Sequence, residues 1–515
     1  MRELKQRSSY LLLGMMLTMS LCACSLTQEK NGKPDTQNNA GVTELATWVN
    51  ENTLLSEASN SSYKEDTAIK ITAEGDQFSS TGRGVVVSGN TVTINAEGCY
   101  LLSGIMNNGQ VIVDADNGTD IRLVLDDFEI HNDAGAAIYV ANAGTITITL
   151  KEGTKNLLEQ TGTNASGQEV QDAALYSTDD LIINGTGTLN ILGNYCHGIK
   201  AKDTLLLTEA TMEVSSKEDA VNANMDILMK SGTYKVSAGD DGVHTDTNFT
   251  VQGGTLEVIK SYEGLEGMQV WIEGGEITVT ANDDAVNIAS NTTSGNGFVL
   301  VVSGGKTKIL AGGDGIDSNG SIYMSGGELE ISGPTNSGNG SLDYTGSCTV
   351  QGGVFTMAGA AGMAQTPDNN STQVGVMVYF NATVAKGTTV SLKDENSNEV
   401  ISITPEVSYQ CAYFSTPELK QGATYSLWQG DTKACDMVMN GTINYYSSDG
   451  TERQGGFGGF GGGMHQGGFD GGKGPGGRGQ GEFDDREQGR GKMQQDMEPL
   501  EGMTPPEGMT PPDGL

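Results

Sequence analysis

The chain has 515 residues, of which 74 are glycine and 6% are aromatic. Its 65 acidic and 29 basic residues give a net charge of -36, which argues against nucleic acid or an anionic membrane surface as a partner and favours cations. Abundant glycine with few aromatic residues is typical of a long, thin fold with many tight turns, and it is unusual for a helical or α/β enzyme.

The first 23 residues have the pattern of a bacterial export signal. Basic residues at positions 2, 5 and 7 precede an apolar stretch at 11–21 that is too short to span a bilayer. The sequence Leu21-Cys22-Ala23-Cys24 resembles the lipobox of bacterial lipoproteins, which implies that Cys24 carries the lipid; signal cleavage without lipidation is the alternative. A diacyl anchor holds a protein stably at a membrane. We therefore expect a lipid-anchored protein on the extracellular face of the bacterial cell membrane.

The next segment, 24–66, is polar and predicts a tether with room for one short helix at 41–55. From Ile69 the sequence changes to short alternating strands that end at Gly, Asn or Asp. Between the strands a short phrase recurs, in which an acidic or small residue precedes Gly or Ala and then an aliphatic residue. The aliphatic positions are 199, 221, 243, 265, 286 and 316, so their successive spacings are 22, 22, 22, 21 and 30.

A second phrase, a glycine-rich turn that opens a strand, recurs in step with the first from Ser231 to Gly352. A unit of about 22 residues with short strands and no room for a helix is one coil of a parallel β-helix, because each coil must stack on a neighbour to bury its apolar face. The Leu and Asn ladder of a leucine-rich repeat is missing. We therefore predict an all-β chain in which 67–372 form a parallel β-helix, with 291–297 as a projecting loop.

After Gln373 the period stops, and 373–450 predict a small separate β unit that can cap the edge strands of the solenoid. We expect its strands near 374–379, 388–392, 399–403 and 426–429. The Gly-rich segment 451–515 predicts a disordered tail. The five cysteines beyond the signal region lack metal-ligand spacing, so we expect no zinc site. Cys411 and Cys435 can pair, and buried free thiols are the alternative.

The recurring phrase places a carboxylate at the same position of five consecutive coils: Asp219, Asp241, Glu263, Asp284 and Asp314. Stacked coils lie about 4.8 Å apart, and unit charges at that separation repel by roughly 3 kcal/mol at an effective dielectric near 20. Three of these turns carry a further acid, at Glu218, Asp240 and Asp283. Three residues after each column member come Asn222, His244, Glu266, Asn287 and Asp317. Without compensation, such a column would be strongly destabilising.

Calcium is the cation that suits this column. It takes about six to eight oxygen ligands at about 2.3–2.6 Å, so one ion between two coils can be reached by a carboxylate from each. Magnesium needs a stricter octahedron and fits less well. The alternative is that Asp-Gly and Asp-Ala only supply turn chemistry, which Asn or Ser would serve equally. The predicted calcium ligands are Glu218, Asp219, Asp240, Asp241, Glu263, Glu266, Asp283, Asp284, Asp314 and Asp317.

Three of these turns, in order and at this spacing, resemble a known family. They are Ser237-Ala-Gly-Asp-Asp-Gly-Val-His, Lys260-Ser-Tyr-Glu-Gly-Leu-Glu-Gly and Thr280-Ala-Asn-Asp-Asp-Ala-Val-Asn. The segment 69–360 is similar to the clostridial carbohydrate-binding β-helix family related to family 9 polysaccharide lyases. The resemblance implies a right-handed parallel β-helix, calcium on the acidic turns, and binding of a plant cell-wall polysaccharide such as cellulose or pectic acid. Asp314 and Asp317 match the family pattern more loosely, because the preceding coil is longer.

Two functions compete with carbohydrate binding. A pectate-type lyase would use calcium and a Lys base, for which Lys200 and Lys260 are the candidates, although either lysine is more commonly a solvated edge residue. A structural or adhesive surface protein is the other alternative, and a hydrolase is disfavoured because metal-bound acids cannot also act as free acid and nucleophile. We favour a monomeric carbohydrate-binding protein. Its candidate sugar contacts beside the acidic column are Lys260, Tyr262 and Trp271.

Overall fold

The computed structural model describes residues 60–164, 170–290 and 297–454. Several predicted features lie outside these ranges: the signal with Cys24, the helix at 41–55, most of the loop at 291–297, and the tail from 455. The described residues are all-β apart from one 3-10 turn, η1 (Glu65–Thr67). No helix in this part of the chain has the length and apolar character needed to cross a bilayer.

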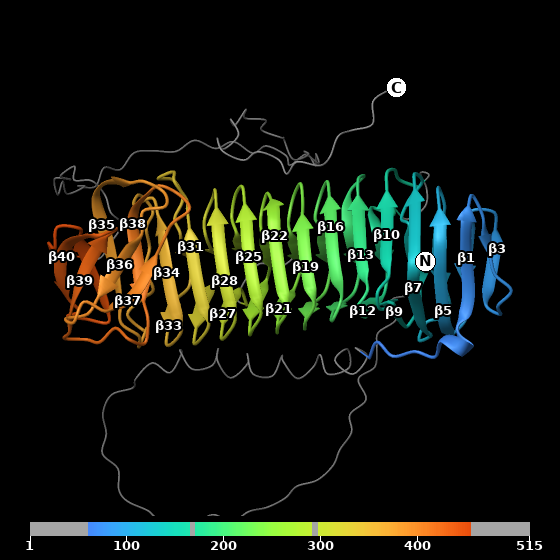
Figure 1. Ribbon diagram of the computed structural model, residues 1–515, viewed down its shortest axis with the longest axis horizontal. Helices are drawn as coiled ribbons and strands as arrows, with labels where there is room; N and C mark the ends of the chain where they lie inside the picture. The colour runs from blue at the N-terminus through green and yellow to red at the C-terminus, as the bar shows by residue number, and fades with distance from the viewer. Residues whose placement is uncertain (1–59, 165–169, 291–296, 455–515) are drawn as a thin grey trace, which may run out of the picture. The chain divides into compact units, whose positions relative to one another are not determined.

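Most strands belong to three parallel stacks, and from Asp120 onward each successive coil adds one strand to each stack (Figure 1). The first stack is a 12-stranded sheet, parallel except for its opening β3–β4 hairpin. It contains β3 (Val85–Ser88), β4 (Thr91–Ile94), β6 (Gln110–Asp114), β8 (Ile138–Asn142), β11 (Ala173–Ser177), β14 (His197–Ala201), β17 (Val221–Ala223), β20 (Val243–Thr245), β23 (Leu265–Gly267), β26 (Val286–Ile288), β29 (Asp317–Ser318) and β32 (Asp343–Tyr344).

The other two stacks belong to one 25-stranded sheet and meet at the long strand β7, which pairs with both β9 and β10. One contains β1 (Ile69–Gly75), β5 (Gly98–Met106), β7 (Asp120–Asn132), β10 (Lys155–Gln160), β13 (Thr188–Gly193), β16 (Thr211–Ser216), β19 (Thr233–Ser237), β22 (Thr255–Ser261), β25 (Glu276–Ala281), β28 (Lys306–Ala311), β31 (Glu328–Ser332) and β34 (Val354–Gly359). The other contains β9 (Thr145–Leu150), β12 (Asp180–Asn184), β15 (Leu205–Leu207), β18 (Ile227–Met229), β21 (Asn248–Val251), β24 (Gln269–Ile272), β27 (Val299–Val302), β30 (Ser321–Met324) and β33 (Cys348–Val350). The short β2 (Phe78–Ser79) pairs antiparallel with β1.

The register between coils follows the sequence repeat. Ile199, Val221, Val243, Leu265 and Val286 are successive partners across β14, β17, β20, β23 and β26. All five side chains are buried. The predicted all-β class and its long parallel sheets are therefore confirmed, and the positions read from the repeat are neighbours in space.

Steric constraints explain why glycine occupies both positions of the glycine-rich turn. In the pair Gly304-Gly305, the second residue has a φ of +72°, a conformation that side-chain-bearing residues rarely adopt. A Cβ on Gly304 would lie only 2.2 Å from the backbone oxygen of Glu273 in the preceding coil. Coils therefore stack closely at this turn only because both positions are glycine.

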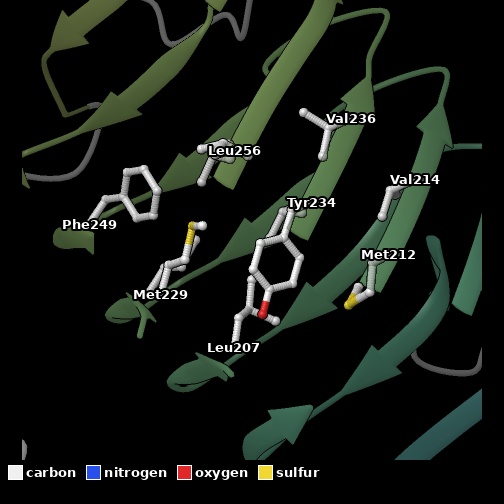
Figure 2. A pocket seen from close by; sticks show the side chains of 11 residues that line it. Leu207, Met212, Val214, Met229, Tyr234, Val236, Phe249 and Leu256 are labelled. Atoms are coloured by element: carbon white, nitrogen blue, oxygen red, sulfur yellow. The ribbon is translucent and has the colours of Figure 1, made fainter. Parts of the chain in front are cut away.

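Apolar side chains from facing strands fill the interior between the stacks. Figure 2 shows one such region, where Tyr234 lies among Met212, Met229, Phe249 and Leu256. The Tyr234 hydroxyl donates a hydrogen bond to the Ser231 carbonyl at 2.7 Å. The other side chains lining this gap are aliphatic, aromatic or thioether groups, so the interior is a packed core. This region therefore offers a polar ligand only the Tyr234 hydroxyl, which is already hydrogen-bonded.

The parallel order ends at β34, which pairs antiparallel with β38 (Tyr409–Ser415). Strand β38 pairs with β35 (Gly375–Val384), and β35 pairs with β41 (Ile443–Ser447). A separate antiparallel sheet contains β36 (Val390–Lys393), β37 (Glu399–Ile403), β39 (Thr424–Gln429) and β40 (Thr432–Val438). These strands share a second hydrophobic core. They cover the edge that β34 would otherwise expose to pairing with another chain.

Candidate acidic site on the coil surface

The five carboxylate residues at the recurring turn, here called the acidic column, lie one above another. Backbone hydrogen bonds join them from coil to coil. In each bond, the carbonyl of a column member accepts the N–H of the Gly or Ala that comes directly after the column member of the preceding coil. The pairs are Ala220 N to Asp241 O, Gly242 N to Glu263 O, Gly264 N to Asp284 O and Ala285 N to Asp314 O, each 3.0 Å. The longer coil before Asp314 thus leaves the register of the column intact.

Two further rows flank the acidic column. In the inner row, strand pairing places Asn222, His244, Glu266, Asn287 and Asp317 in successive register. In the outer row, backbone hydrogen bonds join successive coils through Glu218, Asp240, Tyr262 and Asp283. The turn therefore presents three parallel rows of side chains, and their order follows the order of residues in each coil.

The first cluster on this surface consists of Asp241, Glu263 and Glu266, which bring one ligand atom each within 4.8 Å of the others. Asp241 and Glu266 are buried, with 5% and 8% of their surface exposed. Nδ1 of His244 lies 2.9 Å from Asp241 Oδ2 and 3.3 Å from Glu266 Oε2. This cluster therefore contains an imidazole among its carboxylates.

Burial and charge act against each other in the first cluster. Burial disfavours a charge on His244, but its hydrogen bonds to Asp241 and Glu266 raise its pKa to about 11. Burial raises the pKa of Glu263, and the carboxylates of Asp241, Glu266 and Asp284 raise it further. The imidazolium thus offsets only part of the negative charge that the coils bring together.

The second cluster consists of Asp284, Asp314 and Asp317, again with ligand atoms within 4.8 Å of one another. Burial raises the pKa of Asp284 to about 7, and the negative charges of Asp283, Asp314 and Asp317 contribute to the rise. Burial likewise raises the pKa of Asp314 to about 6. Within the described ranges, Asp284, Asp314 and Asp317 form no ion pair with a basic side chain. Their mutual repulsion therefore has no cationic compensation of the kind that His244 provides in the first cluster.

The donor set of the second cluster fits calcium. Three carboxylates from two coils supply oxygens only, the ligand type that calcium prefers. Asn287 lies in the inner row between Glu266 and Asp317. Its Nδ2 donates a hydrogen bond to Glu263 Oε2 at 2.7 Å, whereas its Oδ1 is buried and has no hydrogen-bond partner. A buried oxygen without a partner costs about 1–3 kcal/mol. An oxygen-binding cation would offset both this cost and the repulsion.

Of the four remaining predicted ligands, Asp219 belongs to the acidic column and forms a three-residue group with Asp241 and His244. The other three belong to the outer row. Glu218 is exposed, whereas Asp240 and Asp283 are partly buried. None of the three belongs to the three-atom groups formed by the described residues. Asp283 accepts a hydrogen bond from the Tyr262 hydroxyl, and this bond is the main reason why the pKa of Tyr262 rises to about 12. The outer row thus flanks the acidic column, with Glu218 and Tyr262 exposed to solvent.

The structure separates the three predicted sugar contacts. Tyr262 is 48% exposed and stands in the outer row between Asp240 and Asp283. Lys260 is exposed at the end of β22, where the register with β25 is irregular. Trp271 lies on β24, in a different stack, and only 7% of it is exposed, so its ring has little free face for a sugar. Of the two aromatic candidates, Tyr262 alone is both exposed and beside the acidic column.

The sequence did not reveal two features of this surface. Asp343 continues the inner row, because it pairs in register with Asp317. The available signal was Leu342, an aliphatic residue directly before Asp343 that forms a weak copy of the recurring phrase. Asp172, Cys196 and His197 form a further group in the coils before Asp219. The cysteines in the described ranges are all free, so Cys411 and Cys435 do not pair.

Comparison with known proteins agrees with the resemblance seen in the acidic turns. The sequence profile of the family described as carbohydrate-binding domain-containing protein matches residues 88–332 and 242–405, which together are more than half of the chain. The chain therefore belongs to this family.

Two individual proteins are similar to the chain. A carbohydrate-binding domain-containing protein from Acetivibrio thermocellus is 33% identical over 159 residues, which are 29% of this chain and 54% of that protein. The match thus spans about half of the relative's length. A solved structure, described as the polysaccharide lyase-like protein from C. thermocellum in a gadolinium derivative, matches 48% of this chain and 92% of its own at 26% identity, with a TM-score of 0.39.

Proposed function

We propose that this chain is a calcium-dependent carbohydrate-binding protein that recognises an acidic or neutral cell-wall polysaccharide on the outer surface of a right-handed parallel β-helix. Family membership supports carbohydrate as the ligand class. The observation that carries the calcium part is the second cluster, in which three carboxylates gather without a basic partner among the described residues. Asn287, which pairs in register with Asp317, has a buried amide oxygen without a hydrogen-bond partner.

Residues Asp284, Asp314 and Asp317 would hold the ion, with Asn287 as a further oxygen donor beside them. A calcium ion bound there supplies positive charge and open coordination positions for sugar hydroxyl or carboxylate oxygens. The chain carries a net charge of -36, so a polyuronate would otherwise be repelled. The exposed ring of Tyr262 offers an apolar face on which a sugar ring can stack.

The surroundings of Lys200 and Lys260 do not support either residue as the catalytic base of a lyase. Lys200 Nζ is engaged by Asp172 Oδ2 at 3.2 Å. Lys260 is exposed to solvent, and its ammonium forms no ion pair with the residues of either carboxylate cluster in the described ranges. We therefore propose binding without bond cleavage, and we keep lyase activity as an outcome that the binding experiment can detect.

The first prediction concerns the polymer. The purified chain is expected to sediment with polygalacturonate or cellulose in millimolar calcium and to stay in solution in excess chelator. Without the cation, the acidic site repels polygalacturonate and offers cellulose hydroxyls no open coordination position. Asp314→Asn should weaken calcium-dependent binding by about tenfold or more, the equivalent of one lost charged ligand. Asp116→Asn, an exposed acid in a distant coil, is the matched control and should bind normally.

The same samples separate the competing functions. Growth of ultraviolet absorbance from unsaturated sugar ends would establish a lyase. Absence of both absorbance and sedimentation across a panel of acidic and neutral polymers would contradict carbohydrate binding and favour an adhesive role. Tyr262→Ala should weaken sedimentation with neutral polymer more than with polygalacturonate, because stacking contributes relatively more where no carboxylate reaches the cation.

We also propose that Cys24 carries a lipid and holds the chain at the extracellular face of the membrane. The lipobox pattern motivates this proposal, and two acyl chains give stable anchoring. In cells that express the full chain, Cys24→Ala is expected to move the protein from the membrane fraction to a soluble or secreted fraction. An equal distribution of both forms would count against the anchor.

A further inference from the structure

A group of different composition precedes the acidic column on the same sheet. Asp172 lies directly before β11, and Cys196 and His197 lie at the start of β14, which pairs with β11 so that Ala173 is beside His197. A carboxylate oxygen of Asp172, the sulfur of Cys196 and a ring nitrogen of His197 lie within 4.8 Å of one another. One carboxylate, one thiol and one imidazole from two adjacent coils therefore meet at one point.

The surroundings hold the carboxylate and the imidazole in place. Asp172 Oδ2 accepts Lys200 Nζ at 3.2 Å, whereas its Oδ1 is buried and has no hydrogen-bond partner. The next coil holds the ring of His197, because its Nδ1 lies 3.2 Å from the backbone N and 3.4 Å from the Oδ2 of Asp219. When one ring nitrogen binds a metal, the other carries the proton and donates it, and the Asp219 carboxylate is an acceptor for that proton. Cys196 is a free, partly buried thiol. A carboxylate, a thiol and an imidazole are thus held close together, and one oxygen of the carboxylate is buried without a hydrogen-bond partner.

From this geometry we propose that Asp172, Cys196 and His197 form a binding site for a transition-metal dication of the zinc type. Zinc accepts thiolate, imidazole and carboxylate ligands in one tetrahedral site, and three protein ligands leave a fourth position for water or another donor. Calcium and magnesium require oxygen ligands and do not suit sulfur and nitrogen. The site therefore differs in ligand chemistry from the two carboxylate clusters and stands independently of the proposed calcium function.

A nucleophilic Cys–His pair is the obvious rival explanation. An activated cysteine needs a base that receives its proton. The hydrogen bonds of the described residues include none between the Cys196 thiol and the His197 ring, whose Nδ1 instead faces the backbone N and the carboxylate of Asp219. The geometry therefore favours a shared metal ion over attack on a substrate.

The test uses the purified full chain, freed of metal by a chelator that is then removed, and titrated with Co²⁺ as a spectroscopic substitute for zinc. Binding at this site should produce a thiolate-to-cobalt charge-transfer band in the near ultraviolet and the visible bands of tetrahedral cobalt. Addition of Zn²⁺ should bleach both, whereas Ca²⁺ should change neither. Absence of these bands in the wild-type chain would overturn the proposal.

Single substitutions show which residues give rise to the cobalt charge-transfer band. Cys196→Ser should abolish the charge-transfer band, whereas the matched Cys99→Ser, which changes another partly buried thiol, should keep it. Asp172→Asn should retain the band at saturation but weaken cobalt binding by about 10- to 100-fold. A band that persists in Cys196→Ser, or an Asp172→Asn variant with unchanged affinity for cobalt, would show that the metal binds elsewhere.

If circular dichroism shows that Cys196→Ser does not fold, the cobalt affinity of Asp172→Asn decides whether the proposal holds. Calcium-dependent melting should be the same in Asp172→Asn as in the wild type, which separates this proposal from the calcium function.

Discussion

Removal of calcium is expected to lower the melting temperature of the protein substantially. The second cluster brings Asp284, Asp314 and Asp317 together without a basic partner in the described part of the chain. A ligand that binds only the folded state at about 1,000 times its Kd adds about 4 kcal/mol to the free energy of unfolding. Calorimetry in millimolar calcium and in excess chelator measures this difference directly.

Two controls make the result specific. Magnesium at the same concentration should restore only part of the stability, because it requires a stricter octahedral geometry. The control variant Asp116→Asn should show the full calcium effect, since the position is exposed and distant from the cluster. A melting temperature that is identical with calcium and with chelator, together with no bound calcium by elemental analysis, would rule out a structural calcium site.

The arrangement of the coils was predictable because stacking depends on a periodic property that one sequence displays. Each coil buries the same aliphatic position, so Val221, Val243 and Leu265 had to recur at one spacing. The glycine turns recur for an equally local reason, the close approach of adjacent backbones. The two recurring phrases share one period, and this period predicts which residues of adjacent coils are neighbours. The rows of side chains on the surface are a consequence of that register.

The partners within each row were not predictable, because they depend on side-chain rotamers and on contacts between coils. His244 stands at a row position that otherwise carries amides and acids, and only the structure shows it between Asp241 and Glu266. Trp271 is close to the acidic turns in sequence but lies in another stack, where it is covered.

Groups assembled across coils leave no spacing signal in the sequence, for a related reason. Asp172 and Cys196 belong to different coils, so their separation along the chain reflects the length of a coil. The expectation of no zinc site rested on spacing along the chain alone, and it stays a prediction that the cobalt titration tests.

In excess chelator, the stability of the protein is expected to fall as the pH rises from about 4 to about 7. Burial and neighbouring carboxylates raise the pKa of Asp284 to about 7 and that of Asp314 to about 6 in the folded state, from the ordinary aspartate value of 3.8. The folded state thus binds protons more tightly than the unfolded state. The resulting stability is complete below the unfolded pKa and is lost as the pH passes through the folded pKa. A tenfold difference in proton affinity between the two states corresponds to about 1.4 kcal/mol, which solvent screening reduces at these partly buried side chains.

Saturating calcium should flatten or reverse this pH profile, because the cation stabilises the ionised carboxylates. Thermal melts between about pH 4 and about pH 8, with and without calcium, measure both curves. A metal-free protein that becomes more stable over this range would contradict the assignment of Asp284 and Asp314 as mutually repelling, buried acids.

The variant Asp284→Asn separates the two effects because it removes charge but keeps the oxygen that accepts the Asp314 N–H at 2.6 Å. At about pH 8 in chelator the variant should be more stable than the wild type, by up to about 3 kcal/mol for each close like-charge contact that is lost. In saturating calcium it should be less stable, since one charged ligand is gone. Only a cation site predicts this change of sign. If Asp284→Asn shifts stability in the same direction with and without calcium, the side chain acts through packing or turn chemistry, and the electrostatic basis of the calcium proposal is lost.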